Sequence, residues 1–237
     1  MKKTVGIYPF TCCEGCQLQI LDLWDKLVEV LEFIDIKHFR MAQEMNVEEK
    51  HDIAIVEGAI STRKEIEDLK RIRKNSGILV AIGECAVTGG IPAIRNDGKG
   101  GKGMLKKTTG IGEHVKVDCN IRGCPIDKGE FLRVITGLAV GRMPYDVNEP
   151  VCMECNNKEI DCLLLKGIPC MGPVTCAGCG ALCPSVGTGC EGCRGMTEDA
   201  GLKQLKDRLE EIGIDRKMIR NMMERFSKEV KHDKHKD

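Results

Sequence analysis

The sequence predicts an α/β protein, with an open and mostly parallel sheet followed by an irregular cysteine-rich segment and C-terminal helices. Three observations support this class. Short apolar runs alternate with helical patterns over residues 1–148, as they do in parallel sheets with crossover helices. Nine of the 15 cysteines lie between Pro150 and Arg194, among many Gly and Pro residues. After Met196 apolar residues again recur at helical spacing. We therefore expect three regions, 1–148, 149–195 and 196–237.

Five segments of the first region have the composition of strands. Thr4–Phe10, His51–Glu57 and Gly77–Gly83 are apolar runs of the kind found in buried parallel strands. Phe33–Phe39 and Val115–Asp118 are the other two candidates. With the helices between them, these segments give the alternation on which the fold class rests.

Three helices are expected among these strands. The second spans Ser61–Asn75, opens with the capping-box pattern Thr62-x-x-Glu65 and repeats apolar residues at helical spacing. The third covers Asp127–Val140. The first carries one apolar stripe, formed by Ile20, Trp24, Leu27, Val28 and Leu31.

The glycine- and lysine-rich stretch Arg95–Gly103 lacks the Gly-Lys-Ser/Thr ending of a phosphate-binding loop, so we expect a flexible loop there. Past Met196 two amphipathic helices are expected to pack on the sheet or on a partner. The two histidines of the terminal KHDKHKD sequence are expected to be solvated rather than to bind metal. The apolar positions of the two helices are Leu202, Leu205, Leu209 and Ile212, and then Ile219, Met222, Phe226 and Val230.

Composition excludes several classes of protein. The 36 Lys and Arg residues balance the 36 Asp and Glu residues, which does not favour nucleic acid or an anionic membrane as a partner. There is no run of 18 apolar residues, and the first residues lack the apolar core of a signal peptide, so we expect a cytoplasmic protein without a membrane span. In a reducing compartment the thiols favour metal or redox chemistry over disulfides.

Four cysteines of the first region follow predicted strands. Cys13 and Cys16 come after the first strand, Cys85 after Gly77–Gly83, and Cys124 after the last. In open α/β sheets ligands bind beyond the carboxyl ends of the strands. We therefore expect these four thiols to converge on one edge of the sheet.

The cysteine-rich segment holds two consecutive sets of four cysteines. Two sets of four thiolates suit two cubane iron–sulfur clusters, although structural zinc sites use similar pairs and the spacing leaves zinc open. With one short apolar run, Leu163–Leu165, the segment is not expected to build its own hydrophobic core, so metal ligation would supply its folding energy. The sets are Cys152, Cys155, Cys162 and Cys170, and then Cys179, Cys183, Cys190 and Cys193.

Three cysteines remain outside these sets: Cys12, Cys119 and Cys176. Each is expected to be a buried thiol or a neighbour of the ligands. Exchange of Cys12 for Cys13, or of Cys176 for Cys170, as a ligand stays open.

Together these motifs resemble the small subunit of [NiFe]-hydrogenases. Phe10–Leu18, Val56–Ala59, Gly83–Ala86 and Gly123–Pro125 resemble its flavodoxin-like domain. Pro150–Cys155 and Cys170–Pro184 resemble the cytoplasmic branch, which includes sulfhydrogenases and cofactor-reducing hydrogenases. The cluster-bearing subunit of respiratory complex I is a more distant relative that lacks the nine-cysteine second half.

The resemblance implies three [4Fe-4S] clusters and a partner large subunit that holds a nickel–iron centre. Electrons from H2 ⇌ 2 H+ + 2 e− would pass between that centre and a flavin or iron–sulfur subunit. This chain would then be a subunit of an oxidoreductase, and the resemblance assigns it no catalytic residue. An electron-transfer subunit of a related non-hydrogenase complex and a zinc-stabilised interaction module are the alternatives. The implied ligands are Cys13, Cys16, Cys85 and Cys124 (proximal), Cys179, Cys183, Cys190 and Cys193 (medial), and Cys152, Cys155, Cys162 and Cys170 (distal).

Glu14 and Glu57 lie next to the expected proximal site. Either carboxylate is a candidate for tuning the cluster potential or for joining a proton path. The alternative is a carboxylate on the surface or at a subunit interface.

Overall fold

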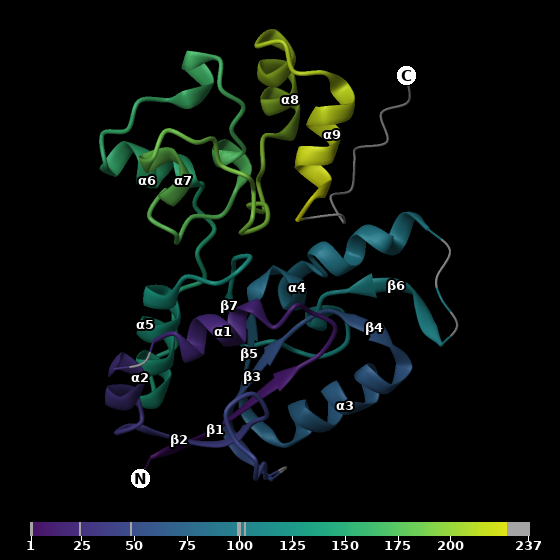
Figure 1. Ribbon diagram of the computed structural model, residues 1–237, viewed down its shortest axis with the longest axis vertical. Coiled ribbons are helices and arrows are strands. Elements are labelled where there is room, and N and C mark those ends of the chain that lie inside the picture. Colours follow the sequence, from purple (N-terminus) through teal and green to yellow (C-terminus); the bar gives the residue numbers. More distant parts are fainter. Residues whose placement is uncertain (1, 24, 48, 99–100, 102, 227–237) are drawn as a thin grey trace.

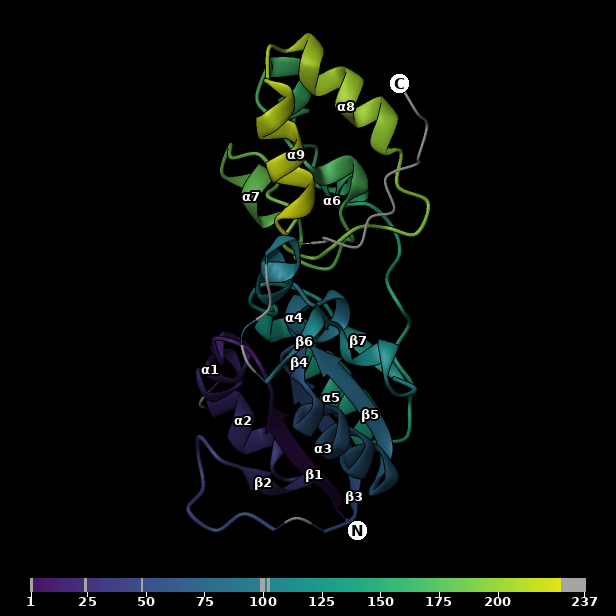
Figure 2. The ribbon, with the colours of Figure 1, turned by 90° about the vertical axis from the view of Figure 1, so that its right-hand side faces the viewer.

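The computed structural model describes residues 2–23, 25–47, 49–98, 101 and 103–226. Two lobes stacked along the long axis are visible in Figures 1 and 2. The N-terminal lobe contains the sheet, and the other lobe contains the cysteine-rich segment and the C-terminal helices. No helix of the described residues is long and apolar enough to cross a bilayer.

Five parallel strands form the sheet, in the order β2-β1-β3-β5-β7. This is the flavodoxin-like order, so the predicted fold class is confirmed. Val5 pairs with Ile53, and Ile55 with Val80, in the three central strands. The strands are β1 (Lys3–Pro9), β2 (Ile34–Phe39), β3 (His51–Glu57), β5 (Ser76–Ile82) and β7 (Cys119–Ile121).

The last strand differs from its prediction. Val115–Asp118 is not a strand, although Val115 and Val117 pack their side chains against the core on one face of the sheet. Asp118 instead ties the chain to the sheet, its carboxylate accepting hydrogen bonds from the Leu79 amide at 2.9 Å and from Arg73 at 2.5 Å. The strand begins only at Cys119, and its three residues contain no apolar run that a sequence pattern could reveal.

Helices cover both faces of this sheet. One face packs against α1 (Gly15–Leu21), α2 (Asp25–Val30) and α5 (Lys128–Ala139), and the other against α3 (Arg63–Lys74). The predicted single first helix is therefore wrong, since the chain breaks it into α1 and α2. Val28 is exposed rather than part of a buried stripe. Trp24 and the side chain of Leu27 lie outside the described residues.

The other two predicted helices are confirmed. In α3 the Thr62 hydroxyl accepts the Glu65 amide hydrogen at 3.2 Å, and the Glu65 carboxylate accepts that of Thr62 at 2.8 Å. This is the expected capping box. In α5 the Asp127 carboxylate caps the helix by accepting the Glu130 amide hydrogen at 2.7 Å.

A small antiparallel pair, β4 (Ile60–Thr62) with β6 (Met104–Thr109), lies beside the sheet. The start of the expected flexible loop is ordered, because Arg95 donates to the Thr108 hydroxyl and to the Leu105 carbonyl, at 2.5 and 3.0 Å. Residues 99, 100 and 102 of that loop lie outside the described residues. The nearby short helices are α4 (Gly83–Thr88), η1 (Ile91–Asp97) and η2 (Ile111–Glu113).

The second lobe is built from short elements around a hydrophobic core of its own. Val151, Leu164 and Val174 from the cysteine-rich segment pack with Leu209 and Ile219 from the C-terminal helices. The elements are α6 (Val151–Asn157), η3 (Leu163–Lys166), η4 (Gly172–Val174), α7 (Leu182–Ser185), α8 (Leu202–Glu211) and α9 (Arg216–Glu224).

The core of this lobe is shared, because apolar residues of the cysteine-rich segment combine with those of α8 and α9. This agrees with the expectation that the segment would not build a hydrophobic core by itself. The expectation that the two helices pack on the sheet is wrong, because they pack on the cysteine-rich segment. The two lobes are in direct contact. The Thr88 hydroxyl of α4 donates to the Phe226 carbonyl at 3.0 Å, and Arg194 donates to the Arg122 carbonyl at 2.8 Å. Val230 and the two tail histidines, His232 and His235, lie outside the described residues.

Candidate metal centre

Four thiols gather where strands β1, β5 and β7 end. Cys13 and Cys16 stand at the start of α1, Cys85 in α4 and Cys124 just after β7. Burial, followed by the charges of Cys124 and Cys13, raises the pKa of the Cys85 thiol to about 12. Burial and then the charge of Cys13 raise the pKa of the Cys124 thiol to about 11. These mutual effects place the thiols together, as the positions of the strand ends predicted.

Glycines keep the space beside these sulfur atoms open. Gly83 has a φ of 77°, and a Cβ atom there would collide with the Cys16 sulfur. A Cβ atom on Gly15 would lie 3.3 Å from the Cys13 sulfur. A larger residue at Gly83 would therefore both strain the backbone and displace a thiol.

Glu57 anchors the helix that carries two of these thiols. Its carboxylate accepts the Cys16 amide hydrogen at 3.0 Å and, through the other oxygen, the Gln17 amide hydrogen at 3.2 Å and the Gln17 side chain at 2.9 Å. The N-cap residue Glu14 makes no such bond and has a φ of 61°. Glu57 thus supplies from β3 the capping that α1 lacks locally.

These two glutamates occupy different environments. The surface interpretation is wrong for Glu57, which is only 2% exposed, while Glu14 is exposed. After burial, the Glu57 charge is the next cause that raises the pKa of the Cys16 thiol. Burial and the Glu57 carboxylate together disfavour ionisation of these thiols. A bound metal cation would favour the thiolate form instead.

A second set of thiols lies in the C-terminal lobe. Cys152 and Cys155 are on α6, Cys162 precedes η3, and Cys170 precedes η4. Burial, followed by the charges of Cys170, Cys155 and Cys162, raises the pKa of the Cys152 thiol to about 11. These four cysteines therefore belong to one neighbourhood.

Two backbone amides donate to the sulfur atom of Cys170. It accepts the amide hydrogens of Cys190 at 3.2 Å and of Gly172 at 3.5 Å. A Cβ atom on Gly172 would lie 3.4 Å from this sulfur and 3.6 Å from that of Cys152. Amide hydrogens directed at a sulfur atom stabilise its negative charge, which suits a thiolate ligand.

The third set comprises Cys179, Cys183, Cys190 and Cys193. Burial raises the pKa of the Cys193 thiol, the charges of Cys179 and Cys183 add to the rise, and the Arg194 guanidinium opposes it. Glu154, on α6, holds the loop that carries Cys179. Its two carboxylate oxygens accept the amide hydrogens of Gly178 at 2.8 Å, Gly180 at 3.0 Å and Ala181 at 2.9 Å.

The three sets adjoin one another in space. The charge of Cys193 is among the causes that raise the pKa of Cys124, after burial and Cys13. The charge of Cys170 raises that of Cys190, after burial. Two contacts agree with this, since the Cys190 amide donates to the Cys170 sulfur at 3.2 Å and Arg194, next to Cys193, donates to the Arg122 carbonyl at 2.8 Å. The third set therefore borders both of the others. Among the described residues, no group of three or more His, Cys, Asp or Glu side chains is arranged to hold a single metal ion.

The remaining cysteines have separate surroundings. Cys119 is buried in the core of the sheet. The Cys176 thiol, also buried, donates to the Met196 carbonyl at 3.3 Å, whereas Cys170 accepts hydrogen bonds beside Cys152. Burial, followed by the Glu57 charge, raises the pKa of the Cys12 thiol to about 12, and Cys85 adds to that rise. Cys12 therefore borders the first set, while Cys119 does not.

Sequence reasoning missed three charged residues that organise these sets: Glu130, Glu154 and Arg194. Arg194 is 2% exposed and forms a two-bond ion pair with Glu130, at 2.7 and 2.9 Å. Two of them could have been noticed from their positions in the sequence. Glu154 lies within the pair Cys152-x-x-Cys155, and Arg194 directly follows the pair Cys190-x-x-Cys193. Nothing in the sequence marks Glu130, whose partner comes from 64 residues away.

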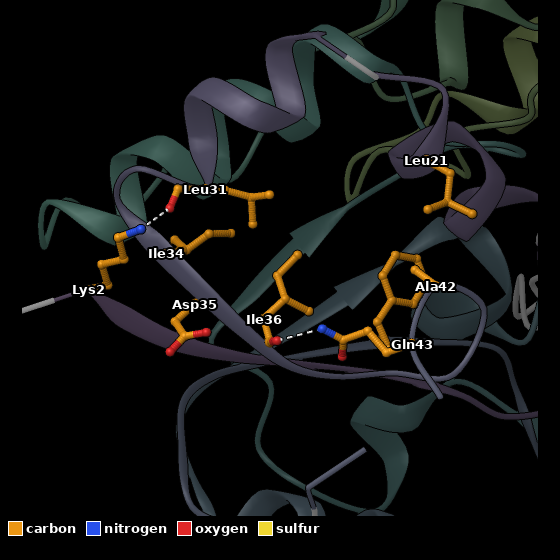
Figure 3. A pocket seen from close by; sticks show the side chains of 9 residues that line it. Lys2, Leu21, Leu31, Ile34, Asp35, Ile36, Ala42 and Gln43 are labelled. Atoms are coloured by element: carbon orange, nitrogen blue, oxygen red, sulfur yellow. Dashed lines mark hydrogen bonds between the residues drawn. The ribbon is translucent and has the colours of Figure 1, made fainter. Parts of the chain in front are cut away.

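An apolar groove of about 360 Å³ lies apart from the cysteines, beside the edge strand β2 (Figure 3). Its lining includes Leu21, Leu31, Ile34 and Ile36 and contains no cysteine. Lys2 donates to the Leu31 carbonyl at 2.6 Å across one side of it. The groove therefore does not belong to the candidate metal centre.

Comparison with known proteins places the fold and the site in context. A family model described as NADH ubiquinone oxidoreductase, 20 Kd subunit, matches residues 13–138. The chain is 39% identical to sulfhydrogenase 2 subunit delta of Pyrococcus furiosus, covering 92% of this chain and 97% of that protein.

Two solved structures extend this likeness. A chain of an NAD+-reducing [NiFe]-hydrogenase in the H2-reduced state is 26% identical, with a TM-score of 0.56, over 61% of this chain and 95% of that one. A chain of the [NiFeSe] hydrogenase from Desulfovibrio vulgaris Hildenborough is 18% identical, with a TM-score of 0.59, over 85% of this chain and 96% of that one. The second likeness concerns the fold alone, and it spans most of both lobes.

Proposed function

The chain belongs to the family of the 20 Kd subunit of NADH ubiquinone oxidoreductase, and from this we propose that it is the iron–sulfur electron-transfer subunit of a [NiFe]-hydrogenase. The observation that carries the proposal is the row of three adjoining four-cysteine sets. The Cys190 amide donates to the Cys170 sulfur at 3.2 Å, and Arg194, next to Cys193, donates to the Arg122 carbonyl at 2.8 Å, two residues before Cys124. A relay needs such a row, because an electron must find a next acceptor nearby at each step.

Each set would hold one [4Fe-4S] cluster, with the ligands that the sequence motifs imply. Cys13, Cys16, Cys85 and Cys124 would be proximal, the set ending at Cys193 medial, and the set ending at Cys170 distal. The clusters, when bound, would supply one-electron carriers. The donor sets fit this group, since each has four thiols, and glycines keep space open beside thiols of the proximal and distal sets.

The chain's own residues would position and tune these groups. Glu57 orients the first turn of α1 and so fixes Cys16. The amide hydrogens of Gly172 and Cys190 stabilise negative charge on the Cys170 sulfur, which favours the reduced state of a cluster bound there. Glu154 fixes the loop that presents Cys179.

Hydrogen activation would take place in a partner large subunit that contains the nickel–iron centre. Two electrons released from each H2 would enter this chain one at a time at the proximal site and leave from the distal site to a flavin or iron–sulfur subunit. The proposal keeps the cytoplasmic location and the division at 148/149 and 195/196 that the sequence predicts.

Anaerobic purification of the complex tests this proposal. Three clusters require about twelve irons per chain. The complex should reduce a dye with H2, whereas the isolated chain should be redox-active without activating H2. A colourless, zinc-containing chain would contradict the proposal, and clusters without H2-dependent dye reduction would indicate a related non-hydrogenase complex.

A matched pair of cysteine variants sharpens the ligand assignment. Cys190→Ser should remove the iron of one cluster, because Cys190 is assigned to the medial set. Cys119→Ser, which changes a thiol equally buried but in the sheet core, should keep all the iron. Equal iron contents in the two variants would contradict the assignment.

The proton-path role of Glu57 has its own test. Glu57→Gln keeps a hydrogen-bond acceptor for α1 but removes the ionisable carboxyl. Turnover coupled to protons should become slower while the iron content, which reports the anchoring of α1, is retained. Unchanged turnover would contradict a proton-transfer role.

A further inference from the structure

Arg194 lies at the junction of two cysteine sets. It follows Cys193 directly in the chain, and its guanidinium donates to the Arg122 carbonyl at 2.8 Å, two residues before Cys124. The same group donates to the carbonyls of Cys176 and Ala177, at 3.2 and 2.7 Å, just ahead of Cys179. One side chain therefore touches the segments that present both the proximal and the medial thiols.

The sheet lobe fixes this guanidinium from the other side. Glu130 of α5 accepts two hydrogen bonds from it, in the paired geometry that makes Arg–carboxylate contacts rigid. Glu130 is 8% exposed, so the pair is shielded from solvent. Its hydrogen-bond network connects α5, the segment before Cys124 and the segment before Cys179.

The backbone is shaped to admit Arg194. Gly178 has a φ of 120°, and a Cβ atom there would collide with the guanidinium and lie 3.0 Å from the Glu130 carboxylate. The loop before Cys179 therefore packs directly against the Arg194–Glu130 ion pair. Any rotation of one lobe against the other would have to break these buried hydrogen bonds.

We propose that Arg194, held by Glu130, is a positioning residue that fixes the proximal and medial cluster sites in one relative arrangement. This inference rests on the proposed function, since it concerns the clusters that the two sets would hold. The positioning depends on the several N–H donors of the planar guanidinium, which bind three segments at once, and not on its positive charge alone.

Two variants separate the fork from the charge. Arg194→Lys keeps a positive charge but cannot make the paired contact with Glu130 or reach three carbonyls. The double variant R194M/E130L replaces the buried pair with apolar residues of similar size, a change that proteins tolerate better than loss of one partner. As a control, R216M/E210L makes the same replacement in an exposed pair of the C-terminal helices.

The measurement is the magnetic interaction between the reduced proximal and medial clusters, observed by electron paramagnetic resonance of the dithionite-reduced complex. We expect its splitting to be lost or broadened in R194K and in R194M/E130L, with full iron content, and unchanged in R216M/E210L. In the same samples, hydrogen exchange of residues 122–124 and 176–178 should rise in both Arg194 variants.

The other possible results have distinct meanings. A wild-type splitting in R194K shows that charge alone suffices and overturns the positioning role, as does a wild-type splitting in R194M/E130L. Selective loss of proximal and medial iron supports the role, whereas loss of all iron together with the helical signal in both variants overturns it in favour of a general folding role. A wild-type complex without clusters would instead contradict the proposed function itself.

Discussion

The two lobes reach order by different means. The sheet lobe has two hydrophobic cores, one on each face of five strands, and these draw on residues from β1 to α5. The cysteine-rich segment contributes only part of one core and obtains the rest from α8 and α9, which follow it in the chain. A segment can thus be rich in ligands and poor in apolar residues when a neighbouring helix pair completes its core.

The pairing of elements shows the same contrast. Strands β1, β3 and β5 have seven residues each and pair along their length, whereas the cysteine-rich segment holds two short helices, α6 and α7, of seven and four residues that belong to no sheet. Helices this short are not stable alone and depend on packing or ligation. The first lobe therefore folds around its strands and holds its cysteines in place, whereas the cysteine-rich segment of the second lobe depends on ligation by its cysteines to fold.

Removing the clusters should break this comparison most clearly. Oxidative loss or chelation of iron should unfold the cysteine-rich segment and leave the sheet folded, because ligation would supply the folding energy that short helices lack. Hydrogen exchange measures this directly: peptides from β3 and β5 should stay protected while those from α6 and α7 exchange rapidly. Equal loss of protection in both lobes would contradict the difference in their sources of order.

Leu209→Ala should have the next largest effect. Leu209 on α8 is completely buried in the shared core. Truncation of such a leucine costs about 2–5 kcal/mol through lost burial and a residual cavity. Denaturant unfolding monitored in the second lobe should show this loss. Leu165→Ala, at a leucine that is 78% exposed, is the matched control and should change little.

Thr62→Ala should destabilise the other lobe by a smaller amount. It removes the hydroxyl that caps α3, which typically costs about 1 kcal/mol. The loss should appear in the unfolding of the sheet while iron content stays unchanged. Thr188→Ala, at an exposed threonine of the cysteine-rich segment without a capping role, serves as the control. A fall in iron content after Thr62→Ala would show that the lobes are coupled more tightly than their separate cores suggest.

The sequence predicted the scaffold well and the connections poorly. The buried strands and the capping box of α3 have local signals, so β3 and α3 were recognised almost to their ends. The residues that hold the site together act over long separations. Glu57 caps a helix 40 residues earlier, and Glu130 meets Arg194 64 residues later. No local pattern encodes such contacts.

The second lobe shows a different reason for failure. Apart from Leu163–Leu165, its apolar residues, such as Val151 and Val174, are isolated among cysteines, glycines and prolines and follow no helical or strand period. They become a core only when α8 and α9 return to cover them. The sequence showed the amphipathic faces of these helices but not the surface they cover.

The smallest expected effect concerns pH and belongs to the sheet lobe alone. His51, at the start of β3, is 5% exposed, and burial lowers the pKa of its imidazole below the ordinary value, although Glu49 and Asp52 oppose this. The unfolded chain therefore binds a proton more readily than the folded one. His51 therefore costs the folded state no stability above about pH 6.5. The free energy of unfolding falls, through this group, as the pH drops from that value toward the lower pKa of the folded state.

Replacing His51 by Phe should remove this component of the pH dependence. The slope that one proton can contribute is at most about 1.4 kcal/mol per pH unit, so the change is modest. Denaturant unfolding of the sheet at pH 7 and pH 5 would measure it. Ile53→Val, a destabilising change in the same strand, should lower stability at both pH values without altering the slope. If H51F keeps the wild-type slope, the acid sensitivity of the sheet lobe arises from another group.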